Sequence, residues 1–259
     1  MTKAQNYDFS GKSVFITGAG SGIGRTTALA FAQAGAKVAA IDMNEAAAQE
    51  TVGQIEAAGG KAIAIKCDVT KSAEVKAAVD QTLSSFGSLD CAFNNAGIEQ
   101  GVYPLTDVTE ELFDKLFDVN VKGVYLCMKH QIPVMEKQGG GTIVNTSSTA
   151  GVLSIRNQGA YCATKYAVVA LSKSTALEVA GQNVRINALC PGITDTPMIE
   201  RVSGGTEEGH ARLVAQEPVG RYARPEEMAR ACMWLCSDDS AFVVGAAINI
   251  DGGQSAGIG

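Results

Sequence analysis

The sequence predicts an α/β protein of the doubly wound type, in which helices cover both faces of a seven-stranded parallel sheet. Short apolar runs alternate along the chain with longer stretches whose apolar residues recur at helical spacing. Strictly alternating strands and helices imply right-handed crossovers, and such crossovers make the strands parallel. Hydrophobic residues make up 46% of the chain and charged residues 19%, which suits a sheet buried on both faces. At 259 residues, the chain fits one domain that spans residues 1–259.

The predicted strands and helices alternate from the start of the chain. The strands cover residues 13–17, 37–41, 62–66, 89–93, 142–145, 184–189 and 246–250. The helices cover residues 22–34, 45–58, 71–85, 109–136, 159–180 and 225–236. Residues suited to helix ends support these limits, because Gly35 follows the first helix, Asn44 and Thr109 can cap the second and fourth, and Pro225 begins the last.

The connection over residues 193–219 is longer than the others and contains Gly204, Gly205 and Gly209. It follows the end of a predicted strand, which is where an open α/β sheet binds its ligand. We interpret this segment as a lid over the substrate. An ordinary surface insertion is the alternative.

Composition excludes several classes of function. The formal net charge of -6 and the sequence pI of about 5.0 leave no basic stripe for a phosphate backbone, so we expect no nucleic-acid partner. Seven cysteines lie in apolar stretches without metal-ligand spacing and there are two histidines, which predicts reduced thiols, no metal site and a cytoplasmic protein. The polar residues 1–10 lack a signal peptide's apolar run, and no stretch approaches the ~18 apolar residues of a membrane span.

A glycine-rich loop follows the first predicted strand and leads directly into the first predicted helix. Glycines let the backbone turn tightly and approach a pyrophosphate, whose charge is met by free N–H groups and the positive end of the helix. Strand, loop and helix in this order predict a Rossmann-type dinucleotide site. Its predicted residues are Gly18, Ser21, Gly22, Ile23 and Gly24. A purely structural glycine turn is the alternative.

An acidic residue at the end of the second strand predicts the choice of cofactor. A carboxylate at Asp42 can accept hydrogen bonds from both hydroxyls of the adenosine ribose and would repel a 2′-phosphate. No cation at Ala19, Ser21, Met43 or Asn44 offsets that charge. We therefore predict NAD as the cofactor. Asp68 and Val69, after the third strand, are expected to flank the adenine, although Asp68 could instead cap the next helix.

Tyr161 and Lys165 lie four residues apart at the start of a predicted helix, so their side chains share one face. A phenol has an ordinary pKa of about 10, but a nearby ammonium and an oxidised nicotinamide both favour the phenolate and can lower that pKa. Tyr161 is then a usable proton shuttle. Taken alone, this pair is more often a solvated surface pair.

Several separated motifs follow one another in a fixed order. After the glycine loop come Asn94-Asn95-Ala96-Gly97, Asn120, Ser147-Ser148, the Tyr161/Lys165 pair, Pro191-Gly192 and Ile250-Asp251-Gly252-Gly253. Together they resemble the short-chain dehydrogenase/reductase family over the whole chain. The resemblance implies an oxidoreductase that transfers a hydride between NAD(H) and a small alcohol/ketone pair.

The resemblance also implies a role for each matching residue. Tyr161 would be the acid/base, Lys165 would lower its pKa and hold the nicotinamide ribose, and Ser148 rather than Ser147 would hydrogen-bond the reacting oxygen. Asn120 would hold a water that links Lys165 to solvent, although an asparagine within a helix is otherwise a bend or a packed amide. The further implied cofactor contacts are Asn95, Gly97, Ile193, Thr194 and Thr196. A homotetramer is implied as well, built on the helices that contain Asn120 and Tyr161 and on the C-terminal strand.

The residues expected around the substrate are mostly apolar and uncharged. They are Gln100, Val102, Ala150, Val152, Leu153, Met198, Ile199 and Val202. They favour a neutral secondary alcohol or ketone, such as a cyclic one, over a 3-oxoacyl thioester, although Arg156 and Arg201 keep that alternative open. A non-catalytic dinucleotide sensor is a further alternative, as is a sugar-nucleotide enzyme of the related extended group, whose chains are longer.

Overall fold

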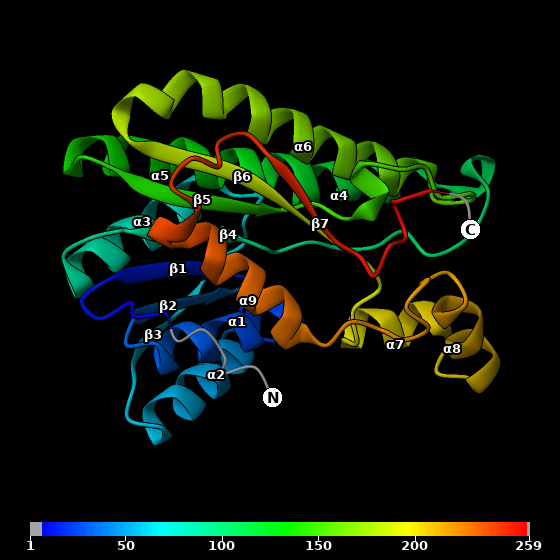
Figure 1. Cartoon of the computed structure of the whole chain (residues 1–259), viewed down its shortest axis with the longest axis horizontal. Coiled ribbons are helices and arrows are strands. Elements are labelled where there is room, and N and C mark those ends of the chain that lie inside the picture. Colours follow the sequence, from blue (N-terminus) through cyan, green and yellow to red (C-terminus); the bar gives the residue numbers. More distant parts are fainter. Residues whose placement is uncertain (1–6, 258–259) are drawn as a thin grey trace.

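The structure confirms the doubly wound fold (Figure 1). It is a computed structural model that describes residues 7–257, so residues 1–6 of the polar start lie outside the described residues. Seven parallel strands form one sheet in the order β3-β2-β1-β4-β5-β6-β7. The order reverses between β1 and β4, and sheets of this kind bind ligands beyond the carboxyl ends of the strands near such a reversal.

Each predicted strand is present, with ends shifted by two residues at most. The strands are β1 (Ser13–Thr17), β2 (Lys37–Asp42), β3 (Lys61–Lys66), β4 (Cys91–Asn94), β5 (Gly141–Thr146), β6 (Val184–Pro191) and β7 (Ala247–Ile250). The helices are α1 (Gly22–Gln33), α2 (Glu45–Ala57), α3 (Ser72–Phe86), α4 (Glu110–Phe117), α5 (Gly123–Gln138), α6 (Gly159–Val179), α7 (Pro197–Ser203), α8 (Glu207–Val214) and α9 (Pro225–Cys236). Asn44 and Thr109 cap α2 and α4 as predicted.

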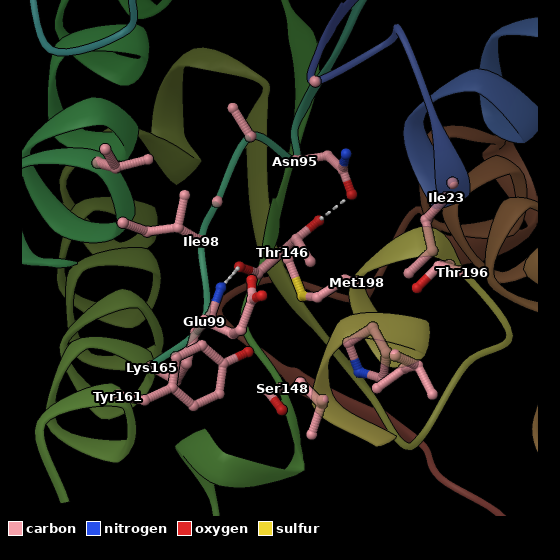
Figure 2. A pocket seen from close by; sticks show the side chains of 18 of the residues that line it. Ile23, Asn95, Ile98, Glu99, Thr146, Ser148, Tyr161, Lys165, Thr196 and Met198 are labelled. Atoms are coloured by element: carbon pink, nitrogen blue, oxygen red, sulfur yellow. Dashed lines mark hydrogen bonds between the residues drawn. The ribbon is translucent and has the colours of Figure 1, made fainter. Parts of the chain in front are cut away.

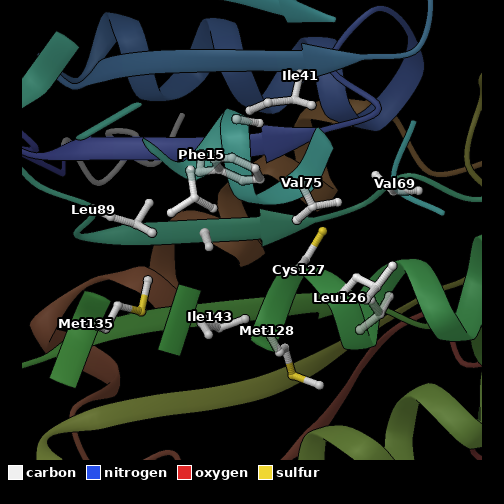
Figure 3. Close-up of a cluster of buried hydrophobic side chains, with 14 of the residues drawn as sticks. Phe15, Ile41, Val69, Val75, Leu89, Leu126, Cys127, Met128, Met135 and Ile143 are labelled. Atoms are coloured by element: carbon white, nitrogen blue, oxygen red, sulfur yellow. The ribbon is translucent and has the colours of Figure 1, made fainter. Parts of the chain in front are cut away.

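Side chains of one strand alternate between two hydrophobic cores, because successive residues of a strand point to opposite faces of the sheet. Phe15 of β1 packs with residues of α3, α5 and α6, in the core drawn in Figure 3. Its neighbours Val14 and Ile16 pack with residues of α1, α2 and α9 on the other face. The sheet is therefore buried on both sides, and ligand access remains at the strand ends.

The helix predicted over residues 109–136 is instead two helices joined by a turn of π-helix. The π turn spans Asp118–Lys122, between α4 and α5. Asn120 sits within it, and its side chain bonds to both backbone groups of Ile98 rather than continuing a regular helix face. Single turns of π-helix occur often at functional sites. The apolar period on either side gave no sign of this insertion.

The segment 193–219 contains two short helices, α7 and α8, that the sequence did not indicate. Thr206 caps α8 by accepting a hydrogen bond from the backbone of Gly209. Each helix is shorter than the 11 to 18 residues over which helical periodicity can be recognised, so both were missed. Figure 1 shows them beyond the carboxyl ends of the strands. In the part of the chain that the structure describes, no helix is long and apolar enough to cross a bilayer.

Candidate active site

A large cavity of about 1240 Å³ opens at the carboxyl ends of the strands. The α7–α8 segment forms its outer wall. Most of the predicted site residues line it: Gly18, Ser21, Gly22, Ile23, Asp42, Asp68, Val69, Asn95, Gly97, Val102, Ser148, Leu153, Tyr161, Lys165, Ile193, Thr194, Thr196, Met198, Ile199 and Val202. The predicted residues that do not line it are Gly24, Gln100, Asn120, Ala150 and Val152.

The glycine-rich loop forms one end of the cavity. Gly18 has a φ of +66°, and a Cβ there would lie 3.1 Å from the Cα of Ala96. A side chain at Gly24 would collide with the carbonyl oxygen of Gly18, so Gly24 supports the loop from beneath instead of lining the cavity. Ser21 makes no side-chain cap of α1, which leaves backbone N–H donors at the helix start for an anion. This cradle fits a pyrophosphate.

Asp42 lies at the rim of the same end. Its Oδ2 accepts a hydrogen bond from the backbone N–H of Gly20, and its Oδ1 accepts one from Asn44, both at 2.9 Å. Each carboxylate oxygen retains a lone pair for a further donor. Among the described residues, the loops after β1, β2 and β3 contribute no basic side chain to the cavity. The basic residues that line it come from later parts of the chain: Lys115, Arg156, Lys165, Arg201 and Arg212. This end of the cavity fits a ribose with free hydroxyls.

The loop after β4 forms the floor of the cavity. The backbone N–H of Asn95 donates to the Thr17 hydroxyl at 2.9 Å, and the Thr146 hydroxyl donates to the Asn95 side chain at 3.4 Å (Figure 2). A Cβ at Gly97 would lie 3.1 Å from Oδ1 of Asn120 and 3.5 Å from Nζ of Lys165. A glycine there keeps the space beside Lys165 open. Asp68 does not cap α3, because its carboxylate accepts from the backbone of Thr70.

Tyr161, Lys165 and Ser148 meet in the middle of the cavity (Figure 2). Nζ of Lys165 lies 5.5 Å from the centre of the Tyr161 ring and donates to the carbonyl oxygen of Thr146 at 3.2 Å. The Ser148 hydroxyl lies beside Tyr161 in the cavity (Figure 2) and acts to lower the pKa of the phenol. The buried hydroxyl of Ser147 instead donates to the carbonyl of Lys165 at 2.8 Å. Ser147 is thus committed to holding β5 against α6, and Ser148 is the serine with a hydroxyl toward the phenol.

Burial dominates the acid–base properties of this group. It raises the pKa of Tyr161 to about 12, against the lowering effect of the Ser148 hydroxyl, and the charge of Glu99 raises that pKa further. Burial also lowers the pKa of Lys165 to about 8. In the chain alone, burial therefore decides the pKa of Tyr161, and the lowering expected from Lys165 together with an oxidised nicotinamide stays a prediction.

Asn120 and Gln100 hold the loop that follows the floor. The amide of Asn120 accepts from the Ile98 N–H, donates to the Ile98 carbonyl and donates to Thr164, at 2.9, 2.9 and 3.1 Å. Gln100, expected beside the substrate, is buried; its Oε1 accepts from the backbone N–H of Tyr161 at 3.0 Å. Its side chain therefore satisfies one of the free donors at the start of α6, where Gln158 provides no side-chain cap.

Two further residues expected around the substrate lie elsewhere. Ala150 is fully buried in the short helix after Ser148. Val152 packs on the small core formed by Val169, Ala188 and Cys190. Both lie close in sequence to residues that do line the cavity. In an irregular loop, however, neighbouring side chains can point in opposite directions, one into the cavity and the next into the core.

The structure also adds cavity residues that the sequence interpretation left out, among them Ala96, Ile98, Glu99, Ile155 and Pro197. Ile98 and Glu99 directly follow the Asn94–Gly97 motif. Ligands of such sheets bind beyond the strand ends, so the residues just after the motif, Ile98 and Glu99, could have been predicted as cavity residues too.

The segment after β6 is anchored where it passes the cavity. The backbone N–H of Ile193 donates to Oε1 of Glu217 at 2.6 Å, and its carbonyl accepts from Ala223 at 2.9 Å. Glu217 is 4% exposed, and burial raises its pKa. Hydrogen bonds thus join the two ends of the α7–α8 segment to each other just after β6. The helices α7 and α8, between these ends, are the part of the segment that covers the cavity.

Known proteins with similar sequences are oxidoreductases. Residues 18–255 match the family described as Enoyl-(Acyl carrier protein) reductase. The chain is 44% identical over 250 residues to a 2,5-dichloro-2,5-cyclohexadiene-1,4-diol dehydrogenase of Sphingobium indicum, covering 96% of this chain and 99% of that protein. It is 42% identical over 252 residues to a cyclohexanol dehydrogenase of an Acinetobacter species, covering 97% and 98%.

A solved structure supports the same relationship. The crystal structure of levodione reductase superimposes with a TM-score of 0.94 at 35% identity, covering 96% of this chain and all of the other. The similarity therefore extends over nearly the whole chain.

Proposed function

This chain belongs to the short-chain dehydrogenase/reductase family and is an oxidoreductase of alcohols and ketones. We propose that it uses NAD to interconvert neutral cyclic secondary alcohols and the corresponding cyclic ketones. The observation that carries the proposal is the position of Tyr161, Ser148 and Lys165 in the cavity whose far end is the glycine loop with Asp42. A hydride carrier and a proton carrier would then meet at one carbon–oxygen bond.

In the proposed reaction, Tyr161 takes the proton of the alcohol hydroxyl during oxidation and returns it to the ketone oxygen during reduction. Ser148 donates a hydrogen bond to that same oxygen. Lys165 stabilises the phenolate by its charge, and Asn120, with one Oδ1 lone pair left, holds the water that relays protons. A bound nicotinamide supplies the hydride acceptor and, when oxidised, a positive charge that favours the phenolate.

Ligand-binding roles follow from the lining. We propose that Gly18, Ser21, Gly22 and Ile23, supported by Gly24, hold the pyrophosphate. Asp42 takes the ribose, Asp68 and Val69 flank the adenine, and Asn95, Gly97, Ile193, Thr194 and Thr196 surround the nicotinamide. The proposed substrate contacts are Leu153, Met198, Ile199 and Val202. All four of these substrate contacts are apolar, which supports a neutral ring over a charged chain, as do the relatives whose names specify ring alcohols.

A substrate panel tests this proposal. The purified protein would be given NAD with cyclohexanol, a linear secondary alcohol and a 3-hydroxyacyl thioester, and the absorbance of the reduced nicotinamide would be followed. We expect turnover of the ring alcohol with the highest kcat/KM. A higher kcat/KM for the thioester would contradict the proposed substrate class, and binding of NAD without turnover of any substrate would favour a dinucleotide sensor.

Alcohol oxidation is expected to accelerate as the pH rises through about 8. Tyr161 and Lys165 titrate as one unit, and the apparent pKa values belong to the pair. The lower value, about 8, results from burial of Lys165; the neutral amine formed above it can accept the phenol proton and so give the phenolate that oxidation needs. Oxidation therefore needs the deprotonated unit and falls below that pH, whereas ketone reduction needs the protonated unit and falls above it. Initial rates in both directions across pH 6 to 10 would check this, and a flat oxidation profile with hydride transfer rate-limiting would speak against Tyr161 as the base.

Gln100→Ala is expected to lower kcat by roughly tenfold to a hundredfold while the affinity for NADH stays unchanged, because a small displacement of a catalytic group is costly. The substitution removes the bond to the Tyr161 N–H without touching the cavity. Gln100→Glu keeps an acceptor for that N–H and should retain more of kcat than the alanine variant. Equal losses in both variants, or a loss of cofactor affinity, would mean that Gln100 does not act by positioning Tyr161.

We further propose a cytoplasmic homotetramer. Large apolar side chains are exposed on α4, α5 and α6, at Phe113, Tyr125 and Tyr166, and beside β7, at Phe242 and Val244. Contiguous exposed apolar surface marks protein contacts, and these are the elements on which the family resemblance places the subunit interfaces. The seven cysteines are free thiols, which suits a reducing compartment. Light scattering of the purified protein measures the assembly directly.

A further inference from the structure

Glu99 is held in place from both sides. The residue before it, Ile98, is bonded through its N–H and its carbonyl to the amide of Asn120. The side chain of the residue after it, Gln100, bonds to the Tyr161 N–H at 3.0 Å and to the Asn157 carbonyl at 3.1 Å. With the neighbours on both sides fixed to the π turn and to α6, the backbone of Glu99 has little freedom, and its side chain starts from a defined point.

That side chain faces the cavity, and it is shielded. Glu99 lines the cavity together with Tyr161 (Figure 2), and its side chain is 19% exposed. The other acidic residues that line the substrate end, Glu111, Asp114 and Asp118 of α4 and the π turn, are exposed at the rim. In the described part of the chain, Glu99 is thus the shielded carboxylate of this end. Because Glu99 and Tyr161 line the same end of one cavity (Figure 2), one small molecule can reach both groups.

Arg201 of α7 pairs with this carboxylate from the opposite wall. Its Nε lies 3.1 Å from Oε1 of Glu99 and its Nη2 lies 3.4 Å from Oε2. Its Nη1 donates to the carbonyl of Pro197 at 3.1 Å. The pair therefore joins the loop after β4 to the α7–α8 segment across the substrate end of the cavity, and both residues line it.

The pair offers an acceptor and donors but no net charge. Each carboxylate oxygen of Glu99 keeps a lone pair, and the guanidinium keeps N–H groups beyond those that it uses. A hydroxyl or carbonyl oxygen can bond to the pair without displacing either partner. A substrate carboxylate or phosphate would compete with Glu99 for Arg201, and the negative charge of Glu99 would repel it. An ion pair that served only to fasten the segment would gain nothing from a shielded carboxylate, because burial costs desolvation.

We propose that Glu99, oriented by Arg201, is a specificity-determining residue that binds a second oxygen of the substrate. The preferred substrates are then ring compounds with a hydroxyl or carbonyl at each side of the ring, namely cyclic diols, hydroxyketones and diketones. One oxygen lies at Tyr161 and Ser148, and the other lies at Glu99. The inference rests on the proposed function and adds the polar group that the apolar contacts leave out.

The test compares two rings that differ by one hydroxyl. With NAD, kcat/KM would be measured for 1,4-cyclohexanediol, per hydroxyl, and for cyclohexanol. We expect the wild type to favour the diol by about tenfold or more, the range for one hydrogen bond to a charged group. Glu99→Ala should abolish that preference by lowering kcat/KM for the diol, with cyclohexanol much less affected. Arg201→Met should reduce the preference, and Glu110→Gln, an equal charge change on α4 outside this cavity, should leave it intact.

A second variant separates recognition from fastening. Glu99→Gln keeps the size and one acceptor, so it should fold as the wild type does and keep part of the preference. Because it removes a charge that raises the Tyr161 pKa, it should also move the pH profile of oxidation to lower pH. Equal kcat/KM for the two rings in the wild type, or equal losses for both in the Glu99 variants, would overturn the inference and leave the proposed function standing. Failure to oxidise either ring would overturn the proposed function itself.

Discussion

Tyr161→Phe is expected to lower kcat for alcohol oxidation by about 10²-fold to 10⁴-fold, the range for loss of a general acid–base group. The substitution removes one oxygen and keeps the ring, so the packing at the start of α6 is preserved. Ser148 and Lys165 remain in the cavity, but neither replaces the phenol: the Ser148 hydroxyl is a much weaker acid than a phenol, and Nζ of Lys165 is bonded to the Thr146 carbonyl. Steady-state kcat with a saturating ring alcohol measures the effect.

Two controls separate chemistry from structure in this experiment. NADH binding by Tyr161→Phe, followed by fluorescence titration, should match the wild type, since the glycine loop and Asp42, which form the cofactor end of the cavity, keep all their side chains. Tyr166→Phe makes the same change on the exposed side of α6 and should leave kcat near the wild-type value. A near-normal kcat in Tyr161→Phe would remove the tyrosine from the mechanism.

The fold could be predicted because its signals are local and repeated. Each strand of the sheet is a short apolar run, and helix ends at Asn44 and Thr109 have capping residues whose bonds the structure contains. The departures have no such signal. The π turn at Asp118–Lys122 depends on a bond from Asn120 to Ile98, twenty-two residues away, and α7 and α8 are too short to show a period.

The site could be predicted where motifs adjoin strand ends, and less well where loops decide direction. Residues beside the glycine loop and the Tyr161 pair line the cavity as a group. Gln100 does not, because its amide bonds to the backbone at the start of α6. The sequence alone cannot distinguish a glutamine that contacts substrate from one that supports the backbone. Glu99 was passed over because its significance comes from Arg201, which lies 102 positions further along the chain. The burial that raises the pKa of Tyr161 in the chain alone has no signal in neighbouring residues either.

The preference for NAD should be the largest effect that a single carboxylate controls in this protein. Asp42 sits at the rim with both oxygens anchored by backbone N–H groups, and no basic residue from the adjoining loops lines the cavity in the described chain. Two unit charges about 4 Å apart interact by about 4 kcal/mol at an effective dielectric of 20. Solvent at the rim reduces this to about 3 kcal/mol, which corresponds to a preference of roughly a hundredfold or more for NAD over NADP.

Asp42→Ser is therefore expected to raise kcat/KM for NADP while lowering it for NAD, because the repulsion of the 2′-phosphate disappears together with the acceptor of the ribose hydroxyls. Adding Met43→Arg at the exposed neighbouring position should shift the ratio further by supplying a cation.

Two control variants accompany this experiment. Asp42→Asn keeps an acceptor for the Gly20 N–H, so it separates loss of charge from loss of loop support. Glu45→Ser removes an exposed acid nearby without contact to the cavity. The measurement is kcat/KM for both cofactors with one ring alcohol. If the wild type already prefers NADP, or if the ratio is the same in Asp42→Ser as in Glu45→Ser, then Asp42 does not face the ribose, and the second strand does not end where the cofactor binds.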